Sequence, residues 1–555
     1  MSLAKSFLFA TSTLALLACT PPAPKADTSV APSISAADIG RRIERLASDD
    51  FEGRDPGTKG GRLASQYIAD EMKAAGLVPM GKDGSYFQPI TLTKTTVADG
   101  SFMKISSADG TATDYDDQNN AVFWTKRYQD SVSINNSELV FVGYGVVAPE
   151  YNWDDYAGID VKGKTVVMFV NDPGFATKDK DLFKGNAMTY YGRWTYKFEE
   201  AARQGVAGVI IVHETAPASY GWSVISGGWG GSQIDLVRPD KGASRAGLES
   251  WISLDSSKAL FARAGLDFDE MKTAAAVQGF KPRMMNGLSM NAQINNTIET
   301  IQSRNVAGAV KGTKYPDEYV MYMAHWDHLG MKDVPEGEDG IYNGAVDNAT
   351  GTATIIEIGE AFAQKPAERS IIVVAVTAEE SGLLGSAYYS EDPLVPLHKT
   401  VAGLNIDAIK PVGRTKDMMV VGFGVSDLDD ILAEIINPKG MYVAPDDKPE
   451  AGYYYRSDHI SLAKKGVPML YTHGGVDHEI NGKSYGEAMN AEYTKERYHA
   501  PSDEYDHTWD ISGIEQTGQI FYELGSHIAN SRTWPNWYEG TEFRGLRDEM
   551  LKKNH

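Results

Sequence analysis

The sequence predicts an α/β fold: a mixed, mostly parallel central sheet flanked by helices, with an inserted β-rich domain. Three short apolar runs bounded by turn signals, at 320–324, 371–376 and 401–406, are typical of buried strands. A helix-like stretch ending near Phe362 separates the first two, and strands that alternate with helices favour a parallel sheet. Each run leads into histidine or acids, at the strand ends where such sheets hold their ligands.

The rest of the chain divides into segments that differ in apolar pattern and glycine content. Residues 36–76 show apolar residues at helical spacing, and Gly76 is expected to end the second helix. From 121 to 285, strand-like runs and dense glycines predict a separate inserted domain, mostly β with some helix. The catalytic domain is therefore expected to comprise residues 36–120 and 286–555.

Further elements are expected on both sides of this boundary. The segment 473–499 is long, polar and irregular, which is typical of a functional or mobile loop, and a pocket lid is one interpretation. The remaining apolar patterns predict strands at 165–170, 206–212 and 467–471 and helices at 194–204, 427–436 and 512–530.

Composition limits the classes of function. The 555 residues carry a net charge of −22, which argues against nucleic acid as a partner because phosphates attract Lys and Arg. The chain has one cysteine, Cys19, so an internal disulfide is excluded.

The N-terminus has the shape of a secretory signal. The apolar run 7–18 is too short to span a bilayer comfortably, and we expect residues 1–18 to be a signal peptide. The stretch 16–19, Leu-Leu-Ala-Cys, resembles a bacterial lipobox; the alternative is a plain signal peptide with a chance cysteine. Residues 19–35 would then be a lipidated Cys19 and a Pro-rich tether. This predicts an exported lipoprotein of the bacterial cell envelope, with membrane contact only through Cys19.

The first candidate ligands follow the first strand. His325 ends that strand, and Asp327 lies on the same side of an extended chain. A metal-binding His commonly donates its other N–H to a carboxylate, which makes Asp327 its expected partner; the alternative is a surface turn with an incidental His. Asp347 lies in a Gly- and Ala-rich turn before a helix, where the alternative is an N-cap residue.

Three more acids stand at the ends of the other two strands. Glu379 and Glu380 follow the second strand, and a solvated acidic pair is the alternative there. Asp407 follows the third strand, where an unpaired buried carboxylate is costly. Imidazole and carboxylates that converge at one sheet edge suit two zinc ions sharing a bridging Asp.

These residues resemble the motifs of peptidase family M28, the co-catalytic zinc aminopeptidases. The early loop 51–58 is also similar to that family, and the inserted region resembles a protease-associated (PA) domain at 163–167 and 205–209. The family-like motifs are His325-Trp326-Asp327, Gly344-Ala345-Val346-Asp347-Asn348, Glu379-Glu380, Asn405-Ile406-Asp407 and Tyr498-His499-Ala500-Pro501-Ser502-Asp503.

The resemblance implies a role for each site residue. One zinc ion would be held by His325, Asp347 and Asp407. The other would be held by Asp347, Glu380 and His499. Glu379 would be the general base, taking a proton from water activated by the two ions and passing it to the leaving amine. Asp327 is placed with the catalytic residues as the partner of His325.

The late histidine is chosen by context. Only His499 sits in the family-like Tyr-His-x-Pro-x-Asp sequence, and the segment 456–459 resembles one near the family's substrate pocket, where the His is not usually a ligand. Tyr453, Tyr454 and Tyr455 are either pocket or core aromatics. The histidines in the last part of the chain are His459, His473, His478, His499 and His507.

The function implied is a metal-dependent aminopeptidase that removes N-terminal residues from peptides. Related cyclases bind one zinc, and a carboxypeptidase needs cationic groups for the substrate carboxylate, yet no arginine cluster lies near the motifs. A non-catalytic binding protein on this fold would lack ligands, and none is missing here. No substrate-binding residue is assigned. The donor mixture favours zinc, with cobalt or manganese as possible substitutes.

Overall fold

The computed structural model describes residues 34–115, 118–228 and 231–553. The predicted signal peptide, Cys19 and most of the tether lie outside these residues, so those expectations stay predictions. None of the helices within the described residues is long and apolar enough to cross a membrane.

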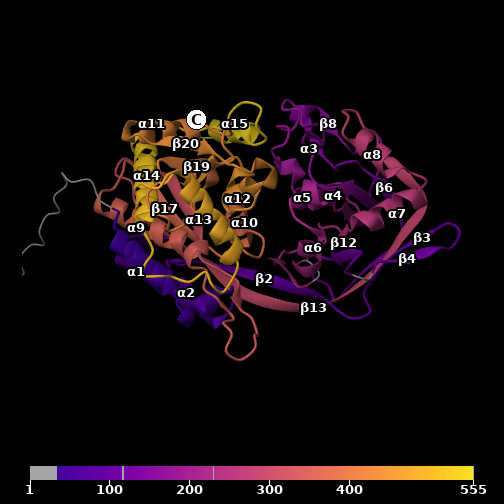
Figure 1. Ribbon diagram of the computed structural model, residues 1–555, viewed down its shortest axis with the longest axis horizontal. Helices are drawn as coiled ribbons and strands as arrows, with labels where there is room; N and C mark the ends of the chain where they lie inside the picture. The colour runs from indigo at the N-terminus through magenta and orange to yellow at the C-terminus, as the bar shows by residue number, and fades with distance from the viewer. Residues whose placement is uncertain (1–33, 116–117, 229–230, 554–555) are drawn as a thin grey trace, which may run out of the picture.

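Two lobes lie side by side, and two long strands run from one to the other (Figure 1). These are β2 (Phe87–Val97) and β13 (Arg283–Val310), which pair antiparallel over the whole length of β2. The N-terminal half of β13 belongs to the sheet of the second lobe, and its C-terminal half belongs to the sheet of the first.

The sheet of the first lobe is mixed. From one edge to the other, the strands are β11 (Gln233–Leu236), β2, β13, β17 (Arg369–Val376), β14 (Tyr315–His325), β18 (Thr400–Asn405), β21 (Met469–Gly474), β19 (Asp417–Val421) and β20 (Tyr442–Pro445), with β1 (Val78–Pro79) beside the end of β13. Parallel pairing joins β17, β14, β18 and β21, and also β19 to β20, whereas the other neighbours are antiparallel.

Helices cover both faces of this sheet, as predicted (Figure 1). Successive side chains of β14 alternate between two cores, since Tyr322 packs in one and Met321 and Met323 pack in the other. The first core is covered by α1 (Ala36–Leu46), α2 (Lys59–Ala74), α9 (Thr350–Gln364), α11 (Leu428–Ile436) and α14 (Ser512–Asn530), and the second by α10 (Leu384–Glu391), α12 (His459–Ala463) and α15 (Arg544–Lys552).

Local sequence signals set the first two helices. The hydroxyl of Ser35 accepts a hydrogen bond from the Asp38 N–H at the start of α1, and Thr58 does the same for Gly61 in α2. Gly76 follows α2 with a φ of 85°, the left-handed conformation expected of a glycine at a helix end. The predicted helix end at Gly76 is therefore confirmed.

The second lobe has its own sheet and its own cores on both faces of that sheet. Its strands, in spatial order, are β4 (Ala112–Asp114), β3 (Phe102–Ser107), β13, β6 (Ser131–Phe141), β9 (Thr165–Phe169), β10 (Gly208–Val212), β12 (Leu248–Ile252) and β5 (Ala121–Trp124). Its helices are α3 (Pro173–Thr177), α4 (Trp194–Arg203), α5 (Thr215–Ala218), α6 (Trp222–Gly228), α7 (Leu254–Arg263) and α8 (Phe268–Ala275). The smallest extended pieces are β7 (Val147–Ala148), which pairs β8 (Trp153–Asp154), and β15 (Gly330–Met331), which pairs β16 (Ile341–Tyr342).

The two sheets divide at other residues than the predicted boundaries at 120 and 286. Strands β3 and β4 precede residue 120 but join the second sheet, and β11 lies within 121–285 but pairs with β2 of the first. The predicted boundaries differ because β13 is a single long strand that belongs to both sheets. No change in the apolar pattern along this strand marks the point where one sheet gives way to the other. The resemblance of the insert to a PA domain stays a prediction.

The expectation of an irregular loop at 473–499 is wrong. Residues Lys483–Glu496 form helix α13. The stretch is rich in good helix formers such as Glu, Ala, Met and Lys. Only Gly486 and Tyr493 are buried along it, so it lacks the apolar periodicity that reveals a packed helix.

Candidate metal centre

The candidate ligands gather at the carboxyl ends of three neighbouring strands. His325 ends β14, which lies between β17 and β18 and is parallel to both. Glu379 and Glu380 follow β17, and Asp407 follows β18. Since parallel strands end at the same edge of a sheet, the fold brings these side chains together, as the sequence predicts.

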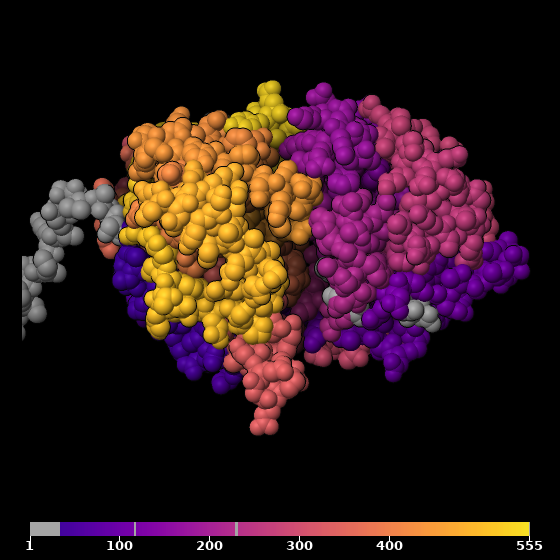
Figure 2. Space-filling view, in the orientation of Figure 1, coloured from indigo at the N-terminus to yellow at the C-terminus, as the bar shows by residue number. Residues whose placement is uncertain are grey.

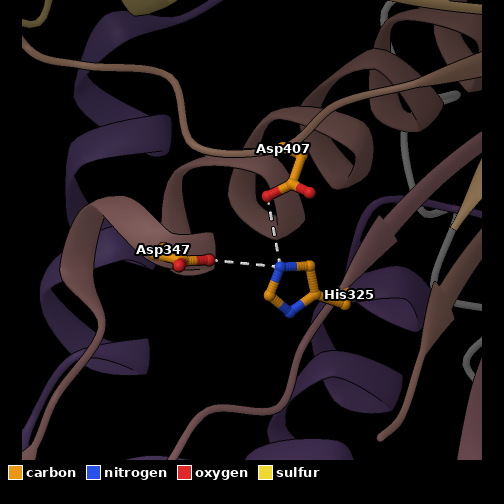
Figure 3. A group of neighbouring side chains, drawn as sticks. All are labelled: His325, Asp347 and Asp407. Carbon is orange, nitrogen blue, oxygen red and sulfur yellow. Dashed lines mark hydrogen bonds and ion pairs between the residues drawn. The ribbon is translucent and has the colours of Figure 1, made fainter. Parts of the chain in front are cut away.

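One group of donors surrounds the imidazole of His325. Its Nε2 atom lies 3.2 Å from Oδ1 of Asp347 and 3.2 Å from Oδ1 of Asp407. Figure 3 shows the two carboxylates converging on that single nitrogen. The three donor atoms are close enough together to hold one metal ion.

A second group lies on the other side of Asp347. Nε2 of His499 is 3.2 Å from Oδ2 of Asp347 and 3.3 Å from Oε2 of Glu380. Nδ1 of His328 lies 2.6 Å from Oε1 of Glu380, and His328, Asp347 and Glu380 also form a group able to hold an ion. Asp347 thus offers one carboxylate oxygen to each group.

These donors fit zinc. Tetrahedral zinc with bonds of about 2.0 Å sets its donor atoms about 3.3 Å apart, close to the separations around Asp347. Nε2 of His328 is buried and has no hydrogen-bond partner among the described residues, whereas its Nδ1 lies against Oε1 of Glu380. Buried polar atoms in proteins are normally paired, so this open nitrogen indicates a missing ligand.

Asp327 does not hold His325 in the expected way. Nδ1 of His325 lies 3.2 Å from the backbone oxygen of Asp327 and 3.9 Å from its carboxylate. The carboxylate instead accepts the backbone N–H groups of Glu379, at 3.1 Å, and Glu380, at 3.4 Å. Asp327 therefore orients the turn that carries the Glu-Glu pair.

The loop that carries Asp347 is held by two side chains to which the sequence assigned no role. The carboxylate of Asp503 accepts the N–H groups of Val346 and Asp347, each at 3.1 Å. The buried guanidinium of Arg54 donates to the carbonyls of Gly344, at 2.8 Å, and Trp326, at 2.8 Å. Arg54 thereby ties the Asp347 loop to the turn that follows His325.

Asp407 and Asp347 are also linked through Asn348. Oδ1 of Asn348 accepts the Ala408 N–H at 3.1 Å, and its Nδ2 donates to the Ile406 carbonyl at 3.0 Å. The hydroxyl of Ser457 donates to Oδ2 of Asp407 at 2.7 Å. The position of each carboxylate is therefore fixed by hydrogen bonds, as metal ligands require.

The charges of the centre shift one another's pKa values. Burial lowers the pKa of His325, but Asp407, Glu379 and Asp347 outweigh it and raise the pKa well above 6.5. Burial raises the pKa of Asp347, but hydrogen bonds from His325 and His499 outweigh it and hold the pKa well below 3.8. Burial, opposed by His325, raises the pKa of Glu379 well above 4.5.

The other late histidines take no part in either group. Burial lowers the pKa of His459 to about 3 and that of His473 to about 4. Tyr454 and Tyr455 are buried in the second core of the first lobe, while Tyr453 is exposed, so the core interpretation holds for two of the three tyrosines.

Sequence comparison places this centre in a family. Residues 305–524, which contain all seven predicted site residues, match the family model described as peptidase family M28. The chain carries a peptidase family M28 domain. His328, which contacts Glu380, also lies within residues 305–524. The sequence signal that could have identified it as a candidate ligand is its position directly after the His-x-Asp motif.

Several known proteins are similar to the M28 domain. The mouse aminopeptidase NAALADL1 is 34% identical over 139 residues, which cover 23% of this chain and 17% of the relative. A glutamate carboxypeptidase 2 homolog of Caenorhabditis elegans is 32% identical over 137 residues, covering 23% and 16%. A probable zinc metalloprotease of Pyrenophora teres f. teres is 30% identical over 112 residues, covering 20% and 24%. The chain thus matches less than a quarter of the length of each.

The solved structure of an aminopeptidase from Aneurinibacillus sp. strain AM-1 is similar over most of the molecule. It is 19% identical, with a TM-score of 0.49, and the similarity covers 90% of this chain and 95% of that one.

Proposed function

We propose that the M28 domain is a zinc-dependent exopeptidase that removes N-terminal residues from peptides. The observation that carries the proposal is the sharing of Asp347, whose two carboxylate oxygens face two separate histidine-containing groups. His325, Asp347 and Asp407 would hold one zinc ion, and Asp347, Glu380 and His499 a second. His328 offers a further nitrogen beside Glu380.

Bound zinc would polarise the scissile carbonyl and lower the pKa of water, which is the chemistry that a neutral-pH hydrolase needs. Glu379 would take a proton from the attacking water and deliver it to the leaving amine. The carboxylate of Asp327 would keep Glu379 in place by accepting the backbone N–H of Glu379.

A carboxypeptidase is the second candidate, because the relatives of the M28 domain include a protein named as a glutamate carboxypeptidase homolog.

We further propose that residues 1–18 direct export and that lipidated Cys19 anchors the protein to the cell envelope.

The test combines metal content with a panel of peptides that have free or acetylated N-termini. Two zinc ions per chain, cleavage of free peptides alone, and loss of activity on chelation are the expected results. Cleavage of acetylated peptides at the C-terminal residue would favour the carboxypeptidase. A protein that binds no divalent metal contradicts both.

A further inference from the structure

Three acids stand at the start of helix α11 without a basic partner. Asp427 accepts the Asn536 N–H at 2.9 Å, and Asp430 accepts the Tyr538 hydroxyl at 2.7 Å. Asp429 lies between them in the sequence and is only 4% exposed. None of the three carboxylates makes an ion pair within the part of the chain that the structure describes. Acids are common at helix N-termini, so the acids alone do not mark a site.

Two buried oxygens at this helix start have no hydrogen-bond partner among the described residues. They are Oδ1 of Asp429 and Oγ of Ser426, a residue only 1% exposed. Ser426 and Asp429 have the spacing of a capping box, in which each side chain would accept the backbone N–H of the other residue. Instead, the Asp429 N–H donates to the Ser426 carbonyl at 3.3 Å, and Oδ2 of Asp429 accepts the Gly424 N–H at 2.7 Å. The capping box is therefore not formed, and both side chains keep an oxygen free.

A third buried oxygen comes from another segment of the first lobe. The hydroxyl of Tyr454, a residue 5% exposed, has no hydrogen-bond partner in the described ranges. Burial and the charges of Glu542 and Asp429 raise the pKa of Tyr454 well above 10, so its hydroxyl lies near the Asp429 carboxylate. The Tyr454 ring packs on Gly422, where an added Cβ would lie 2.1 Å from a ring carbon. Three unpartnered oxygens are thus gathered around the turn between β19 and α11.

This arrangement is unfavourable for the protein alone. Burial and the charges of Asp430 and Asp427 raise the pKa of Asp429 to about 7. A buried carboxylate without a cation is costly, and buried hydroxyls without hydrogen bonds add to that cost. The acidic cluster in the second lobe differs, because Lys197 lies near both of its acids. The missing partner at α11 is therefore a cation.

The chemistry of the donors selects the kind of cation. The turn 422–430 contains no His or Cys, so every donor is an oxygen. The backbone carbonyls of residues 422–424 accept no hydrogen bond from the described residues and are available too. Ca²⁺ takes six to eight oxygen ligands, including carboxylates, carbonyls and waters, in flexible geometry. Gly424 and Asp430 are exposed, so an ion can reach Asp429 from the surface.

We propose that Ser426, Asp429 and Tyr454 form a calcium site that is separate from the zinc centre. Strand β19, which leads into this turn, is antiparallel to β21, whereas β21 is parallel to the strands that carry the zinc ligands. The calcium site therefore lies at the opposite edge of the sheet from His325. Since the proposal involves no residue of the zinc centre, it does not depend on the proposed peptidase function.

Bound Ca²⁺ would fasten the C-terminal segment to the first lobe. Ser426 forms a β-bridge with Trp537, and Asp427 and Asp430 hold the residues on either side of Trp537. Figure 1 shows α11 and the C-terminus at the same end of the first lobe, and the orange and yellow surfaces of these segments meet there in Figure 2. The expected role of the ion is therefore to stabilise the fold.

Calorimetric titration of the zinc-saturated protein with CaCl₂, beside thermal melting, tests the proposal. Zinc saturation keeps Ca²⁺ out of the His325 centre. We expect one Ca²⁺ per chain and a Tm that rises by about 2–5 °C when Ca²⁺ is about 100-fold above its Kd. MgCl₂ should give a smaller rise, because Mg²⁺ demands near-ideal octahedral geometry and gives up its waters reluctantly.

Asp429→Asn should weaken Ca²⁺ binding at least about 10-fold and abolish the rise in Tm, because it removes the buried charged ligand. Without Ca²⁺, this variant should melt no lower than the unchanged protein, since it also removes a buried unpaired charge. Ser426→Ala should lose part of the affinity. Asp172→Asn is the matched control, because Asp172 is a buried acid whose oxygens are already hydrogen-bonded. It should lower the Tm and leave the response to Ca²⁺ unchanged.

Three results would overturn the site. The first is a zinc-saturated protein that shows neither binding heat nor a change in Tm with Ca²⁺. The second is a response to Ca²⁺ of equal size in Asp429→Asn. The third is an Asp429→Asn variant that melts lower than the unchanged protein by the same amount with and without Ca²⁺, which would make Asp429 a structural residue only. A response to Mg²⁺ as large as that to Ca²⁺ would overturn the assignment to calcium.

Discussion

Both lobes bury acidic side chains, but the partners of those acids differ. In the second lobe, the carboxylate of Asp172 accepts the N–H of Gly174 at 3.0 Å and the hydroxyl of Thr189 at 2.6 Å. Asp155 accepts two backbone N–H groups and the indole N–H of Trp153, and the buried Lys197 lies near both acids. These charges are satisfied within the protein.

The acids of the M28 domain face one another and three histidines, His325, His328 and His499. One buried nitrogen of this cluster, Nε2 of His328, has no hydrogen-bond partner among the described residues. The comparison teaches that burial alone does not mark a ligand site. What marks it is a buried donor set whose lone pairs the protein itself leaves unused.

The largest expected effect is on catalysis. Glu379→Gln should lower kcat by about 10²–10⁴-fold, because it removes the proposed general base. Zinc content should stay unchanged, since Glu379 is in neither ligand group. Unaltered turnover in the variant would remove Glu379 from the mechanism.

The second prediction compares one hydrogen-bonded acid from each lobe. Asp503→Asn should weaken zinc binding about 10–100-fold, because Asp503 holds the backbone of Asp347. Asp172→Asn makes the same change in the second lobe, and we expect it to lower the Tm but not the zinc affinity. Competition with a zinc indicator dye measures both. Equal zinc affinities for the two variants would contradict the distinction between the lobes.

The third prediction separates the two histidines beside Glu380. His499→Ala should cost more zinc affinity than His328→Ala, because His499 faces both Asp347 and Glu380 while His328 approaches only Glu380. The same dye competition gives the ranking. A larger loss for His328→Ala would make His328 the ligand and His499 its neighbour.

The fourth prediction concerns pH. The pKa values of His325 and His499 are raised, so the metal-free protein holds protons on atoms that zinc requires. Zinc binding should therefore release protons, and the affinity should rise as pH increases toward those pKa values. Calorimetry in two buffers of different ionisation enthalpy measures the release. Identical heats in both buffers would mean that these histidines are already deprotonated.

The sequence predicts the site residues that directly follow buried strands. His325, the Glu-Glu pair and Asp407 follow apolar strands, so the strand pattern alone predicts their convergence. The roles of Arg54 and Asp503 could not be derived, because both act on backbone atoms of remote loops. Helix α13 was not predicted from the sequence, because few of its residues are buried and it therefore lacks an apolar pattern.

The most direct measurement is the zinc content of the purified, zinc-saturated protein beside that of Asp347→Ala. The account predicts two ions per chain in the unchanged protein and loss of both in the variant, because the two groups share Asp347. One ion per chain, or a variant that keeps one tightly bound ion, would contradict the shared centre.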